Sequence, residues 1–281
     1  MAGLRLPGQL PTSIVSEQDV PIILGLAVAY PFLRYLLSCL VFERLGRRVV
    51  GPRAGAQLPD KVKLRLGKFS ESFWKLVVYS SFVALGLRAV LREPWLDDCG
   101  HFWAAYPSQA HSPELLQYYW LEMAFYISSQ FMLVCWETRR SDFYAMFIHH
   151  CATNSLIMFS YHKSCLRIGS VIMLLHDISD VFLEGAKLCK YAAREAAADG
   201  LFGAFMLSWA VLRLYYFPVV IVQHVVTESL QHLGDEASYY TFSLLLCTLV
   251  VLHVYWFWLI LRVAVNKLVT GKVDDVREED D

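Results

Sequence analysis

The chain has 281 residues, 56% of them hydrophobic, and a formal net charge of −1 at pH 7. A soluble domain is usually about 45–50% apolar, and the excess here lies in blocks of about 20 residues, the length that spans a hydrocarbon core. The near-neutral charge argues against a nucleic-acid partner. The cysteines are scattered without a CxxC pair, which indicates neither a disulfide framework nor a zinc ribbon. The sequence therefore predicts an all-α polytopic protein whose partner is the lipid bilayer.

Seven apolar segments are expected to cross the membrane. In chain order they are residues 20–42, 72–91, 117–136, 143–161, 166–188, 201–226 and 239–265. Pro31 and Arg34 interrupt the first segment, so a kink is expected there. The domain organisation follows: residues 1–68 hold a loose tail, the first span and a basic connection, residues 69–265 hold the other six spans, and residues 266–281 form an acidic tail.

Basic residues set the expected orientation. The first, third and fifth connections carry most of the Lys and Arg residues, whereas the second, fourth and sixth carry few. The positive-inside rule then places the odd-numbered connections and the C-terminus in the cytosol, and the N-terminus on the far side. The sixth connection, near residues 227–238, is predicted to be a loop.

Two polar motifs lie inside the fourth and fifth apolar segments. They are the pair His149-His150 and the string HDISD at 176–180. Ionisable groups at this depth are expensive and usually face a protein interior. At the helical rise per residue, the histidines lie about 10–12 Å from the cytosolic start of their segment, and Asp177 and Asp180 about 10–15 Å from the cytosolic end of theirs. Because a short turn joins these segments, the sequence predicts two imidazoles and two carboxylates at one level, open toward the cytosol.

Two alternatives compete with a catalytic site. Intramembrane His and Asp side chains can simply hold helices together, and a His/Asp zinc site has no supporting ligand spacing. Arg213 lies midway along the sixth segment and could pair with an acid or meet an anionic substrate, with pairing favoured. Glu122 and His253 are expected to be satisfied by neighbouring helices, and the aromatic run at 255–258 to face lipid or the interface.

The central part of the chain resembles the Lag1 motif of ceramide synthases. The matching runs are HHCAT at 149–153, FSY at 159–161, RIGS at 167–170, HDISD at 176–180 and LEGAK at 183–187. The runs at 71–75, 136–143 and 271–273 are similar to the family as well. The resemblance extends over about residues 69–276 and implies a TRAM-Lag1-CLN8 domain, with the last six helices around a central pocket. It is closest to the plant-type members, because the first cytosolic connection is too short for the homeobox-like insert of many animal members.

The resemblance implies a reaction: acyl transfer from a fatty acyl-CoA to the amine of a sphingoid base, sphinganine or phytosphingosine, in the endoplasmic reticulum membrane. It implies acyl-CoA as a substrate, with no cofactor and no metal. The protonated amine must lose a proton, which a histidine can accept, or a histidine can first take the acyl group as an acyl-imidazole. We expect His149 to be the nucleophile or principal base and His150 to assist, with Asp177 and Asp180 orienting and charge-balancing the pair.

Further positions are expected to bind substrate or to tune the reaction. The basic residues at the cytosolic ends are expected to hold the CoA phosphates, an interpretation evenly balanced against a purely topological role. The expected substrate-binding residues are Arg139, Arg140, His176, Lys187 and Arg213, with Lys190 beside them. By resemblance, the loop at 227–238 influences acyl-chain length, and a homo- or heterodimer is compatible with the family.

The main alternative function is a non-enzymatic member of the same domain family, in lipid sensing or protein translocation. Such a protein would not need both histidines and both aspartates, and this chain has all four. A seven-span receptor would explain the topology but not the gathering of these side chains.

Overall fold

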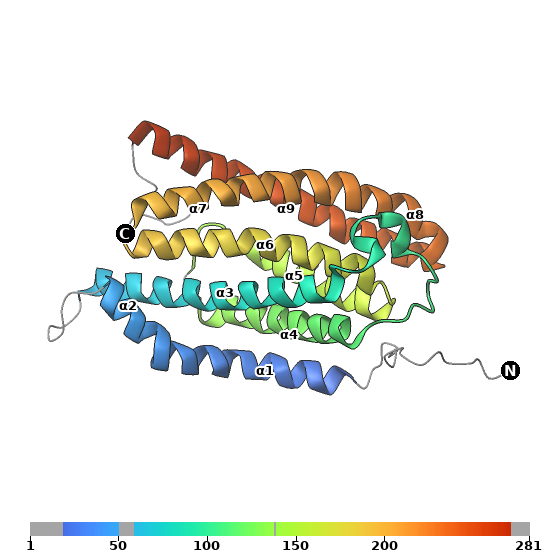
Figure 1. Cartoon of the computed structure of the whole chain (residues 1–281), viewed down its shortest axis with the longest axis horizontal. Coiled ribbons are helices and arrows are strands. Elements are labelled where there is room, and N and C mark those ends of the chain that lie inside the picture. The colour runs from blue at the N-terminus through green and yellow to red at the C-terminus, as the bar shows by residue number, and fades with distance from the viewer. Residues whose placement is uncertain (1–18, 51–58, 138, 271–281) are drawn as a thin grey trace.

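The computed structural model describes residues 19–50, 59–137 and 139–270, which fold into a bundle of long helices (Figure 1). Residues 1–18, 51–58, 138 and 271–281, which include most of both predicted tails and the run at 271–273, lie outside the described residues; residues 266–270 of the predicted acidic tail belong to the last helix. The main helices are α1 (Val20–Leu37), α2 (Glu43–Val50), α3 (Asp60–Val90), α4 (Pro113–Cys135), α5 (Phe143–His162), α6 (Leu166–Tyr191), α7 (Glu195–Ser208), α8 (Gln223–Leu233) and α9 (Glu236–Thr270). Two π-helical segments, η2 (Ser38–Phe42) and η5 (Trp209–Val222), join α1 to α2 and α7 to α8 without a break.

Successive long helical segments run antiparallel along the bundle (Figure 1). The starts of α3, α5 and α7 and the ends of α4, α6 and α9 therefore lie together at one end, drawn on the left of the figure. The basic connections gather at this end, so it is the end that the positive-inside rule assigns to the cytosol. Within the bundle α1 packs on α4, α3 on α6, α6 on α7, and α5 on α9 and α4.

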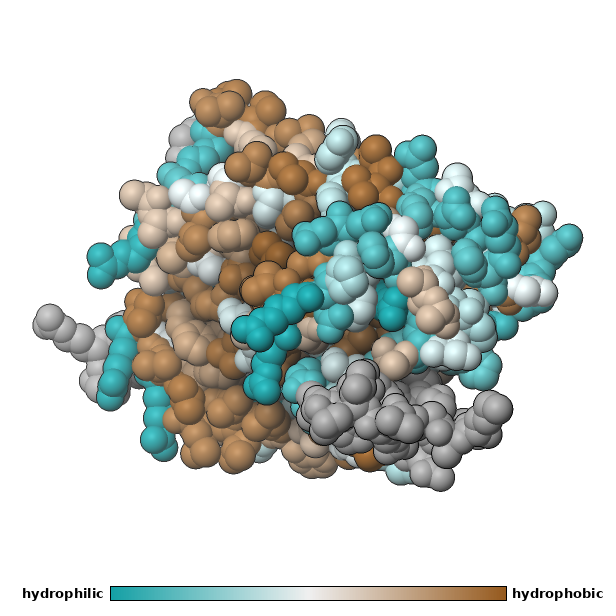
Figure 2. Space-filling model, turned by 45° about the vertical axis from the view of Figure 1, so that its right-hand side comes forward, coloured by the Kyte–Doolittle hydropathy of each residue, from teal (hydrophilic) through white to brown (hydrophobic). Residues whose placement is uncertain are grey.

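The all-α membrane fold is confirmed, and the number of spans stays a prediction. In the described ranges, four helical segments are long and apolar enough to cross a membrane, namely 20–50, 60–90, 195–233 and 236–270. Helices α4, α5 and α6 have 23, 20 and 26 residues, which is long enough, but they carry the polar residues of the site. Figure 2 shows the broad apolar surface along the helix flanks, with hydrophilic residues gathered toward one end.

Several segments predicted as loops are helical. The basic stretch after the first span is helical in α2 and again in the first turns of α3. The predicted loop at 227–238 is wrong except at Gly234 and Asp235, because α9 begins at Glu236 and α8 extends to Leu233. Its buried residues Val225, Ser229 and Leu233 recur every fourth position, so the helical stripe continues through a polar stretch. Gly234, with a φ of 76°, ends the helix in a left-handed conformation that an L side chain would strain.

The linker between α3 and α4 covers the end of the bundle opposite the basic connections (Figure 1). It contains two short 3-10 turns, η3 (Pro94–Leu96) and η4 (Cys99–Phe102). Arg167, at the start of α6, donates hydrogen bonds to two linker carbonyl groups at 2.8 and 3.1 Å and lies over the ring of Trp95 at 4.7 Å. The linker begins α4 with an N-cap, since the Ser112 hydroxyl accepts from the Leu115 N–H at 3.2 Å.

Candidate active site

A cavity of about 220 Å³ lies between the helices near the end where α5 begins and α6 ends. Its floor and one wall are polar, and the wall formed by α7 and α9 is apolar and aromatic. The polar lining comprises Lys75, Tyr79, Tyr126, Ser129, Glu137, Arg140, Asp142, His149, His150, Asp180, Glu184, Lys187, Lys190, Glu195, Asp199 and Arg213. The apolar wall includes Phe202, Phe205, Trp209, Trp256, Leu259, Ile260 and Val263. The pocket thus offers a charged mouth and an apolar flank, an arrangement suited to an amphiphilic molecule.

Both histidines of the pair line this pocket, although adjacent helical residues point about 100° apart. Their ring centroids lie 5.6 Å apart, and the His150 ring lies 6.0 Å from that of Tyr126. Nδ1 of each ring has no hydrogen-bond partner within the described part of the chain. The two imidazoles therefore border the cavity together, that of His150 buried and that of His149 half-buried.

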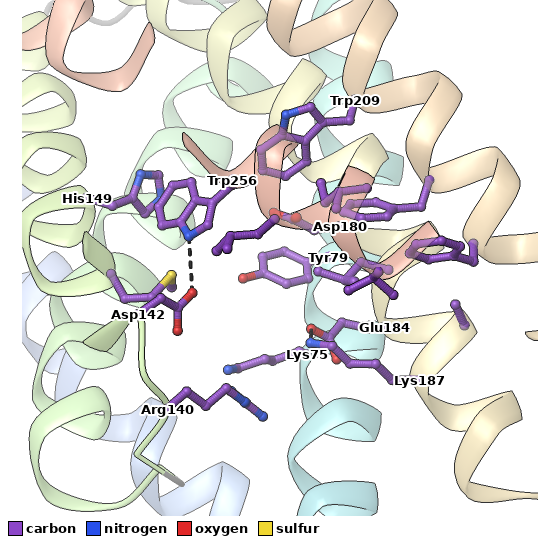
Figure 3. A pocket seen from close by; sticks show the side chains of 18 of the residues that line it. Lys75, Tyr79, Arg140, Asp142, His149, Asp180, Glu184, Lys187, Trp209 and Trp256 are labelled. Atoms are coloured by element: carbon purple, nitrogen blue, oxygen red, sulfur yellow. Dashed lines mark hydrogen bonds and ion pairs between the residues drawn. The ribbon is translucent and has the colours of Figure 1, made fainter. Parts of the chain in front are cut away.

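Trp256 and Asp142 fix the surroundings of His149. The Trp256 ring packs edge-on against the His149 ring at 5.3 Å, and its indole N–H donates to Asp142 Oδ2 at 3.1 Å (Figure 3). Both Trp256 and Asp142 are buried. The expectation that the aromatic run 255–258 faces lipid or the interface is therefore wrong for Trp256, because its indole N–H finds a carboxylate partner inside the bundle.

Asp180 lies in the pocket wall and pairs with Arg213, as the favoured interpretation of Arg213 predicted. Asp180 Oδ1 lies 2.8 Å from Arg213 Nη2, and the same nitrogen donates to the His176 carbonyl at 2.7 Å. The guanidinium also lies over the Trp209 ring at 4.1 Å. In Figure 3, Asp180 and His149 lie on opposite sides of the pocket.

Asp177 points away from this pocket. It is fully buried and accepts a hydrogen bond from the Tyr118 hydroxyl at 3.4 Å, on the side of α6 that faces α3 and α4. The buried Glu122 of α4 lies in the same interior region. The structure therefore brings three of the four predicted catalytic residues to the pocket and leaves Asp177 behind the wall.

His176 also lies behind the pocket, where it joins α6 to α9. Its Nδ1 lies 2.6 Å from the Ile172 carbonyl and must therefore carry a proton and donate it. Its Nε2 then accepts from Nε2–H of His253 at 3.0 Å. The expectation that neighbouring helices satisfy His253 is confirmed. His176, His149 and Tyr126 line a second, smaller and largely apolar cavity of about 40 Å³ between α5 and α6.

The basic residues predicted to bind substrate divide into two groups. Arg140, Lys187 and Lys190 line the mouth of the pocket. Arg139 is exposed and lies over the Phe143 ring at 4.4 Å, outside the lining. Lys187 Nζ pairs with Glu184 Oε1 at 2.7 Å, so acids share the mouth with the cations (Figure 3).

The two helices that carry the polar motifs do not pack chiefly against each other, although the sequence analysis expected them to be neighbours. A short turn joins α5 to α6, but α5 packs chiefly on α9 and α4, and α6 on α3 and α7. The His pair and Asp180 therefore meet across a cavity and not along a tight helix–helix seam. The turn fixes only the adjoining helix ends, while the side chains farther along decide which helices pack together.

Sequence reasoning missed several residues of the lining. Lys75, Tyr79, Glu137, Asp142 and Glu184 all face the pocket (Figure 3). Most of them lie in runs that the sequence matched to the Lag1 family, and this was the only signal that could have singled them out. Charges near helix ends otherwise look like ordinary interfacial residues.

In the portion of the chain that the structure describes, no group of three or more His, Cys, Asp or Glu side chains lies close enough to hold a metal ion. The pocket's donor set instead combines imidazoles, paired carboxylates and cations. That set suits proton transfer and the binding of an anionic, long-chain substrate. Whether the reaction proceeds without metal or cofactor stays a prediction.

This helical bundle, with its His pair and Asp180 lining an interior pocket, is that of a TLC-domain membrane protein. The family model of the TLC domain (TRAM, LAG1 and CLN8) matches residues 68–262, and the chain belongs to this family.

Within the family, the chain groups with the ceramide synthases of the Lag1 type. It is 40% identical to ASC1-like protein 3 of Oryza sativa subsp. japonica over 267 residues, which cover 92% of this chain and 94% of that protein. It is 39% identical to Ceramide synthase LOH1 of Arabidopsis thaliana over 286 residues, covering 95% and 92% of the two chains. Ceramide synthase 5 of Homo sapiens is 41% identical over 208 residues, which are 74% of this chain and 53% of that protein.

Proposed function

We propose that the protein is a sphingosine N-acyltransferase, which transfers a fatty acyl group from acyl-CoA to the amine of a sphingoid base to make ceramide or dihydroceramide. The observation that carries the proposal is the pair of adjacent imidazoles, His149 and His150, lining a pocket with a charged mouth and an apolar wall. The similarity to proteins named ceramide synthase supports the same reaction.

The acyl donor sets what the site must do. A thioester is already activated, so the enzyme needs no further energy source; it must supply a deprotonated amine and stabilise the tetrahedral intermediate. In the direct route, His149 accepts a proton from the ammonium group and the free amine attacks the thioester carbonyl. The tetrahedral intermediate then expels the CoA thiolate, which takes up the second proton that the nitrogen loses as the amide forms.

In the covalent route, a ring nitrogen of His149 attacks the thioester carbonyl and expels the CoA thiolate. The amine then attacks the resulting acyl-imidazole, the amide bond forms, and the imidazole is released. His150 assists by holding or relaying the proton that the amine loses. Both routes need His149 neutral when the donor binds, and the packing of its ring on Trp256 suits this requirement because it removes water from the ring.

The acids act at a distance from the imidazoles. Asp180, held by Arg213, balances the positive charge that develops on the histidines during proton transfer. Asp177, held by Tyr118, supports α6 from behind and keeps Asp180 at the pocket wall. The proposed role of Asp177 is therefore positioning, by a different contact from that of Asp180.

The mouth binds the CoA part of the donor. Arg140, Lys187 and Lys190 lie where the phosphates of acyl-CoA would meet the protein, and phosphate recognition favours Arg and Lys. Arg139 lies next to them, and His176 and Arg213 support the wall. The proposed setting is the endoplasmic reticulum membrane, with this mouth and the C-terminus in the cytosol and the N-terminus in the lumen. We propose that the protein forms a dimer, with a second copy or with a relative, on the resemblance to the family alone.

The reaction is tested on purified full-length protein in detergent. We would supply a panel of fatty acyl-CoA substrates with and without sphinganine and follow ceramide and free CoA by mass spectrometry. Ceramide formed by the wild type, and absent from a His149→Ala/His150→Ala variant, supports the proposal. CoA release without sphinganine, with acyl mass on the His149 peptide, favours the covalent route. Binding of acyl-CoA without any product would favour the alternative, a non-enzymatic TLC-domain protein in lipid sensing or translocation.

A further inference from the structure

Arg34 is a cation in the last turn of α1, within the first apolar segment, and the structure buries it. Helix α1 lies outside residues 68–262, which the family model covers. The Arg34 side chain nevertheless is only 5% exposed, and its guanidinium points into the bundle. A charge inside an apolar helix is costly unless it is paired, so the partner of Arg34 indicates what the residue does.

Arg34 begins a chain of alternating charges that leads to the pocket. Its Nη1 lies 3.2 Å from Glu137 Oε1, and the other oxygen of Glu137 lies 2.8 Å from Lys75 Nζ. Lys75 also pairs with Glu71 at 3.1 Å. Both terminal nitrogens of Arg140 donate to Glu71 Oε1 at 3.3 Å. We call these five residues the mouth network.

The mouth network joins the first helix to the lining of the cavity. Glu137, Lys75 and Arg140 all line the pocket, whereas Arg34 is absent from the lining and reaches it only through Glu137. Figure 3 shows Lys75 and Arg140 side by side at the cavity's edge. Three cations and two carboxylates give these five residues one net positive charge, in a lining that also carries Asp142, Glu184, Lys187 and Lys190.

Arg34 controls that net charge through a single carboxylate. Glu137 divides its two oxygens between Arg34 and Lys75, so each cation is only partly neutralised by it. Without Arg34 the network would hold two cations and two carboxylates, and Glu137 would act on Lys75 alone. The pairs are buried, with Arg34 and Glu137 side chains 5% and 8% exposed, so the change would be only weakly screened by salt.

We propose that Arg34 is a positioning residue for the phosphate-bearing end of the acyl donor, acting through Glu137 on Lys75. The inference rests on the proposed function, since it takes acyl-CoA as the anionic substrate. It assigns to α1, which lies outside the TLC domain, a part in substrate binding beyond anchoring the chain. Removal of the Arg34 charge should weaken the binding of acyl-CoA and leave the cationic sphingoid base unaffected.

The test compares three variants of the full-length, detergent-solubilised protein. Arg34→Gln removes the charge, Arg34→Lys keeps it, and Arg48→Gln removes the same charge from an exposed residue of α2. We would measure KM for palmitoyl-CoA, KM for sphinganine and kcat, together with direct binding of palmitoyl-CoA in the absence of sphinganine.

For Arg34→Gln we expect KM and Kd for palmitoyl-CoA to rise about three- to tenfold, the size expected for one elementary charge about 12–25 Å from the phosphates at an effective dielectric constant of about 20. KM for sphinganine and kcat should stay at their wild-type values. Arg34→Lys should recover most of the lost affinity for palmitoyl-CoA. Equal effects of Arg34→Gln and Arg48→Gln would overturn the inference. So would a loss of kcat and thermal stability that Arg34→Lys does not restore, because that pattern marks a purely structural role. If the wild type binds palmitoyl-CoA but makes no ceramide, the proposed function fails while the Kd comparison still decides the role of Arg34.

Discussion

Asp180 and Arg213 form an ion pair at the pocket wall, with 2.8 Å between Oδ1 and Nη2. They lie on α6 and η5, and their side chains are 17% and 5% exposed. The pair ties the helix that carries the second polar motif to the long segment that carries the apolar wall. Because the Arg213 guanidinium also holds the His176 carbonyl, the pair fixes the backbone next to Asp177 and Asp180.

Replacing only one member of this ion pair should destabilise the protein more than replacing both members. Asp180→Asn leaves Arg213 buried without a counter-charge, a loss that typically costs about 3–5 kcal/mol. The double variant Asp180→Asn/Arg213→Gln removes both charges and should recover part of that loss. Thermal unfolding of the purified proteins measures the difference. Equal melting temperatures for the wild type and Asp180→Asn would show that the pair contributes little to stability.

Trp256→Phe should slow the reaction without unfolding the protein. Phenylalanine retains much of the contact with the His149 ring but loses the N–H that donates to Asp142. We expect a decrease in kcat of about tenfold, the effect of about 1.4 kcal/mol on the barrier, with KM for acyl-CoA nearly unchanged. Trp258→Phe is a matched control, because Trp258 is largely exposed on the same helix. Similar kinetics for the two variants would contradict a role of Trp256 in positioning His149.

Gly169 allows α6 to approach α4 closely. A Cβ atom added there would overlap the Tyr119 hydroxyl and come within 3.1 Å of Ser160 Oγ. We therefore expect Gly169→Ala to destabilise the protein by about 1–3 kcal/mol, as overpacked cores do. Tyr119→Phe in that background removes the overlapping oxygen and should recover part of the loss. A Gly169→Ala protein as stable as the wild type, measured by thermal unfolding, would contradict this packing.

His111, in the linker that covers the far end of the bundle, should make stability depend on pH. Burial, with a smaller effect from the nearby Arg167 charge, lowers the pKa of His111 to about 4. Its unfolded-state pKa is about 6.5, so between these values the unfolded chain binds more protons and stability falls as the pH falls.

The matched variant for this effect is His111→Gln, which removes the titrating group. Between pH 7 and pH 5 the wild type should lose about 1–2 kcal/mol more stability than the variant. The difference between the two proteins isolates His111 from the other histidines of that end. Parallel stability curves for both proteins across this range would mean that His111 is not held neutral by the fold.

The sequence predicted the helical fold class. It also singled out the residues whose type is unusual within an apolar segment. His149 and His150 stand out because paired imidazoles are rare in an apolar segment. The partner of Arg213 lies 33 positions earlier in the chain, and no local pattern links it to Asp180. That contact follows from the packing of η5 on α6.

Other parts of the site depend on packing that a linear reading cannot supply. Lys75, Glu137 and Asp142 lie near the ends of apolar segments, where charges usually mark the membrane interface. Lys75 lines the pocket because α3 begins well before the apolar stretch, whereas Glu137 and Asp142 line it from the connection between α4 and α5. The end of α8 was misjudged because polar composition was given more weight than the repeat of Val225, Ser229 and Leu233.

We propose above that His149 carries the acyl transfer in a pocket that receives acyl-CoA. The most direct measurement compares His149→Ala, His150→Ala and wild-type protein, each checked by thermal unfolding and by palmitoyl-CoA binding, for ceramide formed from palmitoyl-CoA and sphinganine. We expect His149→Ala to stay folded, to bind palmitoyl-CoA and to lose at least about 100-fold in kcat, the usual effect of removing a general base or nucleophile. His150→Ala should lose less. Ceramide formation by His149→Ala at the wild-type rate would contradict the account.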